Sequence, residues 1–192
     1  MIEGLLLAAG SSARYGRNKL LEPLADGVPL GLQSARHLLT ALPRSIAVVA
    51  PDNQGLADLL RQEGMRVVTN PMADQGMGAS LACAVRAASE QADGWVVALA
   101  DMPWIVPNTI AEIAACLQQG NLLVAPQYHG RRGHPVGFSA RFRSELLGLN
   151  GDVGARQLLE DNADRLLLLT VNDPGIFRDV DRPDDLIDSV AE

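Results

Sequence analysis

A cluster of cationic and small side chains near the start of the chain has the composition of a phosphate-binding loop. Residues 5–21, LLLAAGSSARYGRNKLL, join an apolar stretch to a glycine and serine loop that contains Arg14, Arg17 and Lys19. Lys19 is the only lysine in a chain whose other basic residues are all arginine. A lysine ammonium is a compact point charge and a guanidinium is a planar fork, so the two are not equivalent around phosphates. We therefore expect Lys19 to contact a polyphosphate, although an arginine-rich composition could also leave one lysine there by chance.

The surroundings of this loop favour an anion. No aspartate or glutamate occurs between Glu3 and Glu22, although the whole chain has a net charge of −7. Gly10 lets a ligand approach the backbone closely, and consecutive N–H groups at a strand end form an anion-binding concavity. The spacing is not that of a P-loop, because five residues separate Gly10 from Gly16 and an arginine follows. The loop also lacks the G-x-G-x-x-G dinucleotide pattern.

Two acidic positions are candidates for holding a metal ion. Asp101 follows the apolar run 95–100, so its carboxylate is expected at the tip of a buried strand. Mg²⁺ takes one or two protein carboxylates and completes its coordination with phosphate oxygens and water. Asp179 and Asp181 point to opposite faces if their segment is extended, and we expect Asp181 to reach the site. The alternatives are structural: Asp101 begins a turn, and Asp181 caps a helix near Pro183.

A glycine-rich segment could contact the nucleotide base. In QGMGASL, three small residues and an amide stand at a predicted helix start, where Gln75, Gly76 and Ser80 could face a base. One alternative is a flexible helix entrance. Another is a degenerate dinucleotide turn, but Leu81 stands where that pattern needs glycine or alanine.

Two later segments could bind an anionic second substrate. The stretch RRGHPVGF combines cations, a histidine and glycines, and we assign Arg132 and His134 to acceptor binding. A loop histidine beside a proline is more often structural than catalytic. Asp152, in GDVGAR, stands at another candidate anion site at a helix start, or is a simple helix cap.

These candidates follow the strands of a predicted α/β fold. Continuous apolar runs predict strands at 4–8, 45–50, 66–69, 95–100 and 122–126. Apolar spacings of three and four predict helices at 30–42, 54–62, 78–90 and 107–117. The residue pattern in the last third of the sequence is less regular. It predicts a hairpin at 128–133, strands at 136–139 and 165–171, and helices at 141–148, 153–163 and after Pro183. Some antiparallel strand pairing is expected there. Ligands of such sheets bind beyond the carboxyl ends of the strands, so the loops after the first, third and fourth strands should open onto one edge.

The composition narrows the classes of function. A chain of 192 residues with 47% hydrophobic content is expected to form a single domain over 1–192. Its negative net charge argues against a nucleic-acid partner. Cys83 and Cys116 lack metal-ligand spacing and are expected to be reduced thiols, which together with the lack of a signal sequence favours a cytoplasmic protein. No apolar run approaches the roughly 18 residues of a membrane span.

Taken together, the motifs resemble those of the MobA-like nucleotidyltransferases, and within them the molybdenum cofactor cytidylyltransferase branch, which is MocA-like. The resemblance extends over nearly the full chain. It rests on LAAGSSxRxGxxKLL from Leu7, QGMxxSL from Gln75, ADMP from Ala100, HPV from His134, GDxGAR from Gly151 and DVDxPxDL from Asp179. It implies a Rossmann-like nucleotidyltransferase fold with three α/β/α layers and a mostly parallel mixed sheet. The chain departs from common family patterns at Tyr15 and Arg182, and neither position is a proposed metal ligand.

The resemblance also implies a reaction, in which CMP passes from CTP to the phosphate of molybdopterin and pyrophosphate is released with Mg²⁺ as cofactor. Arg14, Lys19 and Asp101 would be catalytic, and Asp101 and Asp181 would hold Mg²⁺. The nucleotide would be bound by Ala8, Ala9, Gly10, Ser11, Arg14, Lys19, Gln75, Gly76, Ser80 and Asp101. Ala9 would favour cytosine, because the guanylyltransferase branch resembles Leu-Ala-Gly-Gly at this place.

Three alternatives remain open at the level of the sequence. The chain could transfer a cytidylyl or guanylyl group to another phosphorylated acceptor. It could be a related nicotinamide-dependent oxidoreductase on the same scaffold, although an intact metal and triphosphate site argues against hydride transfer. It could also be a nucleotide-binding carrier without turnover. We further expect a monomer, a molybdenum hydroxylase as recipient of the product, and no membrane partner.

Overall fold

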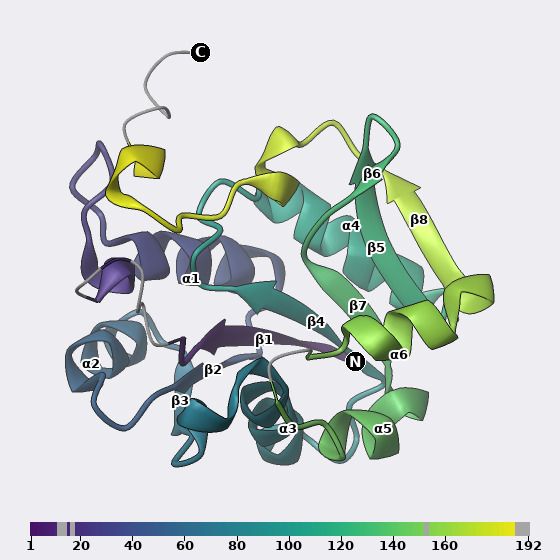
Figure 1. The fold of residues 1–192 in the computed structure, drawn as a ribbon. Coiled ribbons are helices and arrows are strands. Elements are labelled where there is room, and N and C mark those ends of the chain that lie inside the picture. Colours follow the sequence, from purple (N-terminus) through teal and green to yellow (C-terminus); the bar gives the residue numbers. More distant parts are fainter. Residues whose placement is uncertain (11–14, 16–17, 152–153, 187–192) are drawn as a thin grey trace.

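The computed structural model describes residues 1–10, 15, 18–151 and 154–186. The chain folds around one sheet of eight strands, shown in Figure 1. These are β1 (Ile2–Ala8), β2 (Ser45–Val49), β3 (Arg66–Thr69), β4 (Gly94–Leu99), β5 (Leu123–Tyr128), β6 (Arg131–Arg132), β7 (Val136–Ser139) and β8 (Leu166–Thr170). Their order is β3-β2-β1-β4-β7-β5-β6, and β8 also pairs with β5.

The sheet is mixed and mostly parallel, as the resemblance implied. β1 runs parallel to β2 and β4, β2 to β3, and β5 to β8. β7 is antiparallel to both β4 and β5, and it places Phe138 opposite Trp95 and Leu123. β5 and β6 form the predicted hairpin, whose two turn residues, His129 and Gly130, both have positive φ angles. The antiparallel pairing expected in the last third is therefore confirmed.

Helices cover both faces of the sheet and give the three layers of an α/β/α fold (Figure 1). One face packs against α1 (Leu30–Ala41), α2 (Gln54–Gln62) and α4 (Pro107–Gln118). The other packs against α3 (Met77–Ala87), α5 (Arg143–Leu147) and α6 (Arg156–Asp161). Among the described residues, no helix combines the length and the apolar character needed to cross a membrane.

The central strand β1 shows why the sheet needs both layers. All seven of its residues are buried, and successive side chains point to opposite faces. Leu6 and Ala8 enter the core that contains α1, whereas Leu5 and Leu7 enter the core that contains α3. A strand buried on both sides has a continuous apolar sequence, which is the pattern that predicted it.

Most predicted elements agree with the structure within a few residues, and the differences lie mainly at helix ends. The helix predicted over 78–90 ends at Ala87, and Ser89 donates its N–H to the buried Glu3 carboxylate instead of continuing the helix. The helix predicted over 141–148 is a short 3₁₀ turn followed by α5. Of the helix predicted after Pro183, the structure describes only the beginning, a 3₁₀ turn at Pro183–Leu186, and the rest lies outside the described residues.

Candidate active site

A pocket of about 380 Å³ opens at the carboxyl edge of the sheet, beyond the ends of β1, β3 and β4. Residues from the three loops after these strands and from the start of α3 line it together: Ala9, Gly10, Lys19, Gly76, Ser80 and Asp101. The structure thus gathers these sequence-predicted residues around one cavity at the place where open α/β sheets bind ligands. A Cβ atom built on Gly10 meets no atom of the described residues within 4 Å, so these residues leave space for a ligand beside the Gly10 backbone. We call this cavity the first pocket.

Two other predicted nucleotide contacts, Ala8 and Gln75, are not among the residues that line this pocket. Ala8 is buried in the core on the α1 side of the sheet. Gln75 is exposed at the end of a 3₁₀ turn, Ala73–Gln75. Ser11, Arg14 and Asp152 lie outside the described residues. The lining also contains Asp74 and several apolar residues that sequence reasoning did not single out, although they flank the predicted motifs in the same loops.

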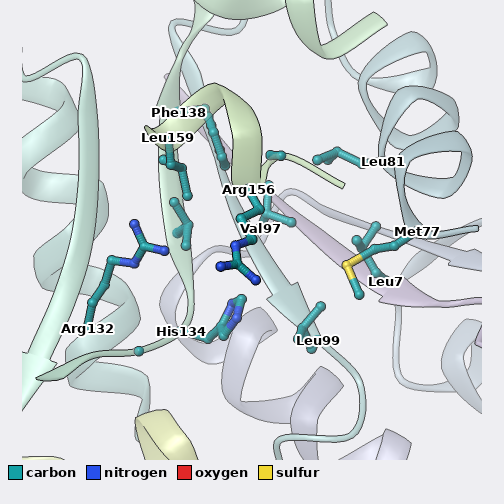
Figure 2. Close-up of a pocket in the computed structure, with 13 residues that line it drawn as sticks. Leu7, Met77, Leu81, Val97, Leu99, Arg132, His134, Phe138, Arg156 and Leu159 are labelled. Atoms are coloured by element: carbon teal, nitrogen blue, oxygen red, sulfur yellow. The ribbon is translucent and has the colours of Figure 1, made fainter. Parts of the chain in front are cut away.

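A second pocket of about 270 Å³ adjoins the first, because Leu7, Met77 and Leu99 line both. Its walls are mainly apolar and come from the core beneath α3 and α6. Polar atoms enter from Arg132, His134 and Arg156, which Figure 2 shows around the same cavity. Two of the predicted acceptor residues therefore share one pocket. Arg156 belongs to the GDVGAR segment that the sequence indicated as a candidate anion site, although only Asp152 of that segment was assigned to acceptor binding.

His134 lies at the polar side of the second pocket and is held by its backbone. Its N–H donates to the carbonyl oxygen of Ile176 at 3.0 Å. Burial lowers the pKa of the His134 imidazole; Arg132 lowers it further, while Asp101 and Asp179 act in the opposite direction. The neutral form is favoured near pH 7, so the ring can accept a hydrogen bond from a ligand as well as donate one.

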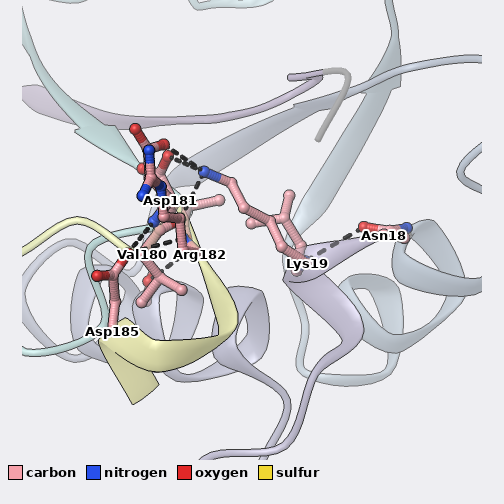
Figure 3. A network of polar contacts seen from close by, with 10 residues as sticks. Asn18, Lys19, Val180, Asp181, Arg182 and Asp185 are labelled. Atoms are coloured by element: carbon pink, nitrogen blue, oxygen red, sulfur yellow. Dashed lines mark hydrogen bonds and ion pairs between the residues drawn. The ribbon is translucent and has the colours of Figure 1, made fainter. Parts of the chain in front are cut away.

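Lys19 joins two acidic side chains at the edge of the first pocket (Figure 3). Its Nζ donates to Asp101 Oδ2 at 2.9 Å, to Asp181 Oδ1 at 3.3 Å and to the Val180 carbonyl oxygen at 2.7 Å. Burial by itself lowers the pKa of Lys19, but the charges and hydrogen bonds of Asp101 and Asp181 outweigh this and raise it. The ammonium is therefore charged, and it balances two carboxylates that would otherwise repel each other.

Asp181 reaches this position through a segment that we call the strap, residues 173–181. Val180 is fully buried, and its N–H donates to the Asp101 carbonyl oxygen at 3.0 Å. In the 3₁₀ turn that follows the strap, Asp185 Oδ2 accepts hydrogen bonds from the backbone N–H groups of Asp181 and Arg182 at 2.8 and 2.7 Å. Sequence reasoning missed the roles of Val180 and Asp185, although both belong to the DVDxPxDL motif.

The donor set at Lys19 fits a small divalent cation. The carboxylates of Asp101 and Asp181 converge on a single cationic atom, and oxygen is the ligand type that Mg²⁺ and Mn²⁺ prefer. Across the described part of the chain, no group of three or more histidine, cysteine, aspartate or glutamate side chains is placed to hold an ion. Two carboxylates suit an ion that takes its remaining ligands from phosphate oxygens and water.

Comparisons with known proteins agree with this geometry. The purine catabolism protein PucB of Bacillus subtilis is 29% identical over 192 residues, which cover 95% of this chain and 92% of PucB. The crystal structure of Rv0371c from Mycobacterium tuberculosis H37Rv is 28% identical, has a TM-score of 0.86, and the match covers 100% of this chain and 98% of that one. A complex of Rv0371c with manganese is 26% identical with a TM-score of 0.82, and covers 97% of this chain and 96% of that one.

The family model for the MobA-like NTP transferase domain matches residues 4–166. This range includes all the residues that line the two pockets, among them Lys19, Asp101 and His134, whereas the strap follows it in the sequence. The chain belongs to the MobA-like NTP transferase family and is a nucleotidyltransferase.

Proposed function

We propose that the protein transfers CMP from CTP to the phosphate of molybdopterin and releases pyrophosphate. The observation that carries this proposal is that Lys19, bound to Asp101 and Asp181, lines with Asp101 a pocket that shares a wall with a second, partly cationic pocket. A group transfer between two bound molecules needs two adjoining sites with the charged groups near their junction. The cytosine preference and the molybdopterin acceptor rest on the family resemblance of the motifs.

In this proposal the first pocket holds CTP. Lys19 faces phosphate oxygens, and the open space at Gly10 lets the backbone approach them. Ser80 and Gly76 contact the base and sugar, while Ala9, only 6% exposed in the loop after β1, leaves room on the base side. Ser11 and Arg14 are proposed to complete the phosphate contacts.

The second pocket holds the acceptor. Its apolar walls suit a flat organic ring system, and Arg132, His134 and Arg156 suit an anionic group at its mouth. Arg156 already forms a 2.8 Å ion pair with Glu160, which orients its guanidinium, and neutral His134 adds a directional hydrogen bond. Asp152, which belongs to the same GDxGAR motif as Arg156 and lies outside the described residues, is proposed to contact the acceptor as well.

The chemistry requires positioning and charge stabilisation more than a general base. An acceptor phosphate is already ionised near neutral pH, so its oxygen can attack the α-phosphorus of CTP directly. A new P–O bond forms as the bond to pyrophosphate breaks, and Lys19 neutralises negative charge on the departing phosphates. Asp101 and Asp181 would hold Mg²⁺, which when bound polarises phosphate oxygens. The strap keeps Asp181 within reach of Asp101 during this step.

The first test is pyrophosphate release from CTP, GTP and ATP with Mg²⁺ in the presence and absence of molybdopterin. Release with CTP that depends on molybdopterin would establish the proposed reaction. Tight CTP binding without release would instead favour a carrier role or a different phosphorylated acceptor. Binding of NAD(P)H in preference to CTP would favour the oxidoreductase alternative, and a lack of response to any nucleotide would overturn the proposal.

A further inference from the structure

A buried asparagine lies beside the first pocket and belongs to none of the predicted site residues. Asn70 follows β3 directly, and its backbone N–H donates to the Val49 carbonyl oxygen at 2.9 Å, which continues the pairing of β3 with β2. The residue is only 3% exposed. Buried amides are kept in folded proteins when their donors and acceptors are satisfied, so the partners of Asn70 define what it does.

The backbone of the following turn fixes which way the amide faces. The N–H of Met72 donates to Asn70 Oδ1 at 3.0 Å. A backbone N–H can only donate, so the oxygen of the amide must lie on this side. The NH₂ group is therefore directed to the opposite side, where Asn70 Nδ2 donates to Ser80 Oγ at 3.2 Å. The orientation of this amide follows from the network and needs no further assumption.

This orientation sets the polarity of the Ser80 hydroxyl. Ser80 is 4% exposed, lies in the first turns of α3 and lines the first pocket. Its oxygen accepts a hydrogen from Asn70, and within the described residues this is the hydrogen bond that the hydroxyl makes. A hydroxyl has one hydrogen and two lone pairs. With one lone pair engaged by the amide, its hydrogen remains available for an acceptor in the pocket.

We propose that Asn70 is a positioning residue that makes the Ser80 hydroxyl a hydrogen-bond donor, so that the first pocket selects nucleotides with an acceptor atom of the base or ribose at that point. The inference rests on the proposed function, because it takes the ligand of the first pocket to be a nucleotide. A base acceptor would be a carbonyl oxygen or an unprotonated ring nitrogen, and a ribose acceptor would be a hydroxyl oxygen.

Two substitutions of Asn70 distinguish polarity from structural support. Asn70→Asp keeps an acceptor for the Met72 N–H but presents only acceptors to Ser80, whose hydrogen then turns toward the new carboxylate. Asn70→Ala removes both hydrogen bonds but leaves the Ser80 hydroxyl free to donate to a ligand. A purely structural role makes alanine the more harmful substitution. A polarity role makes aspartate the more harmful one.

The experiment is a double-mutant cycle on CTP binding, measured by calorimetry with Mg²⁺ on the full chain. We expect Ser80→Ala to weaken binding by about fivefold to tenfold, which corresponds to one hydrogen bond. In the wild-type background, Asn70→Asp should weaken CTP binding at least as much as Ser80→Ala does. In the Ser80→Ala background, where only the added charge acts, Asn70→Asp should weaken CTP binding clearly less. Asn70→Ala should weaken it least. Thermal unfolding of each variant checks that the fold is retained.

Ligand variants separate the two sources of the acceptor. If the acceptor is the ribose 2′-hydroxyl, the loss caused by Ser80→Ala should disappear with 2′-deoxy-CTP; if it is on the base, the loss should persist. Tripolyphosphate, which has no base or ribose, should bind equally well to the wild-type protein and to Ser80→Ala. If Ser80→Ala weakened tripolyphosphate binding as much as it weakens CTP binding, the inference would be overturned. Equal losses for Asn70→Asp in both backgrounds, or a greater loss for Asn70→Ala, would also overturn it while leaving the proposed function intact. Absence of CTP binding by the wild-type protein would overturn both.

Discussion

At the scale of single residues, the Lys19 ammonium donates to three acceptors among the described residues. Asp101, Asp181 and the Val180 carbonyl oxygen lie 2.9, 3.3 and 2.7 Å from Nζ. A guanidinium presents its donors in one plane and could not reproduce this arrangement, which explains why a lysine suits this position in an arginine-rich chain. Lys19 thus orders the carboxylates as well as contributing charge to the first pocket.

Replacing Lys19 should remove turnover and leave the fold in place. We expect Lys19→Ala to lower kcat/KM for pyrophosphate release by at least about a hundredfold, because charge on the departing phosphates is no longer neutralised. Asp101→Ala should lower kcat/KM by a similar factor. Lys19→Arg is the matched control for charge, and this variant should have little activity, because the planar guanidinium does not place its donors as the ammonium does. Robust turnover by folded Lys19→Ala would remove this residue from the mechanism.

Gly10 offers a test of the first pocket that leaves the charges unchanged. An added methyl group at this position meets no atom of the described residues within 4 Å, so Gly10→Ala should fold normally. The methyl group would occupy space that the nucleotide needs, and CTP binding should weaken by about tenfold or more. Gly55→Ala is the control, since its Cβ would lie 3.8 Å from Leu21, outside the first pocket. Similar CTP affinities for the two variants would show that Gly10 does not face the nucleotide.

At the scale of elements, the strap connects the two pockets. Asp173 is 3% exposed and anchors the strap to the start of α4, because it accepts hydrogens from Val106 N at 3.0 Å, Thr109 Oγ1 at 2.7 Å and Gly175 N at 2.9 Å. Farther along, Ile176 accepts the His134 N–H of the second pocket, and Val180 donates to Asp101. The position of Asp181 therefore depends on hydrogen bonds made well away from it.

Loss of the Asp173 anchor should affect both stability and activity. Asp173→Ala leaves buried donors without an acceptor, and we expect it to reduce the free energy of unfolding by about 1–3 kcal/mol, measured by urea denaturation. Activity of the folded fraction should fall as well, because the strap no longer holds Asp181. Thr109→Val removes only one of these hydrogen bonds and should have a smaller effect on both quantities. Full activity in Asp173→Ala would show that the strap is positioned without this anchor.

At the scale of the whole molecule, the second pocket is a gap in one of the two cores. Leu81, Val97, Phe138 and Leu159 belong to the core on the α3 side and also line this pocket. An organic ring bound there would contact the same apolar side chains that stabilise the fold. Burial of His134 beside this core also links the ionisation of the pocket to global stability.

The stability of the protein should therefore fall at acid pH in a way that depends on His134. The pKa of His134 is lowered in the folded protein, whereas histidine in an unfolded chain titrates near about 6.5. As the pH falls through that value, the unfolded chain binds a proton that the folded protein resists, so the free energy of unfolding decreases. Denaturation at pH values between about 7.5 and about 5.5 should show a smaller decrease for His134→Gln than for the wild-type protein.

Arg132 supplies the matched control for this pH dependence. Its charge contributes to the lowered pKa of His134, so Arg132→Gln should bring the folded and unfolded pKa values closer and also reduce the loss of stability. The effect should be smaller than that of His134→Gln, because burial remains. Identical pH dependence in all three proteins would show that His134 does not contribute to the acid sensitivity of the fold.

The sequence by itself determined the α/β class, the strand and helix positions and the family. Short continuous apolar runs such as the one in β1 indicate strands buried on both faces, and parallel strands place the loops that follow them on one edge. The side-chain types at Lys19, Asp101 and Ser80 were likewise sufficient to suggest a phosphate, metal and base site. Local patterns carry this information because they depend on backbone geometry and burial within a few residues.

Only the tertiary structure decided how distant residues meet. Lys19 and Asp181 are 162 positions apart in the sequence, and their contact depends on the strap crossing the end of β4. The second pocket, the direction of the Asn70 amide toward Ser80 and the contact of Ser89 with Glu3 after the end of α3 likewise follow from packing between separate elements. Local propensities do not contain these long-range contacts, because each depends on where the rest of the chain places its partner.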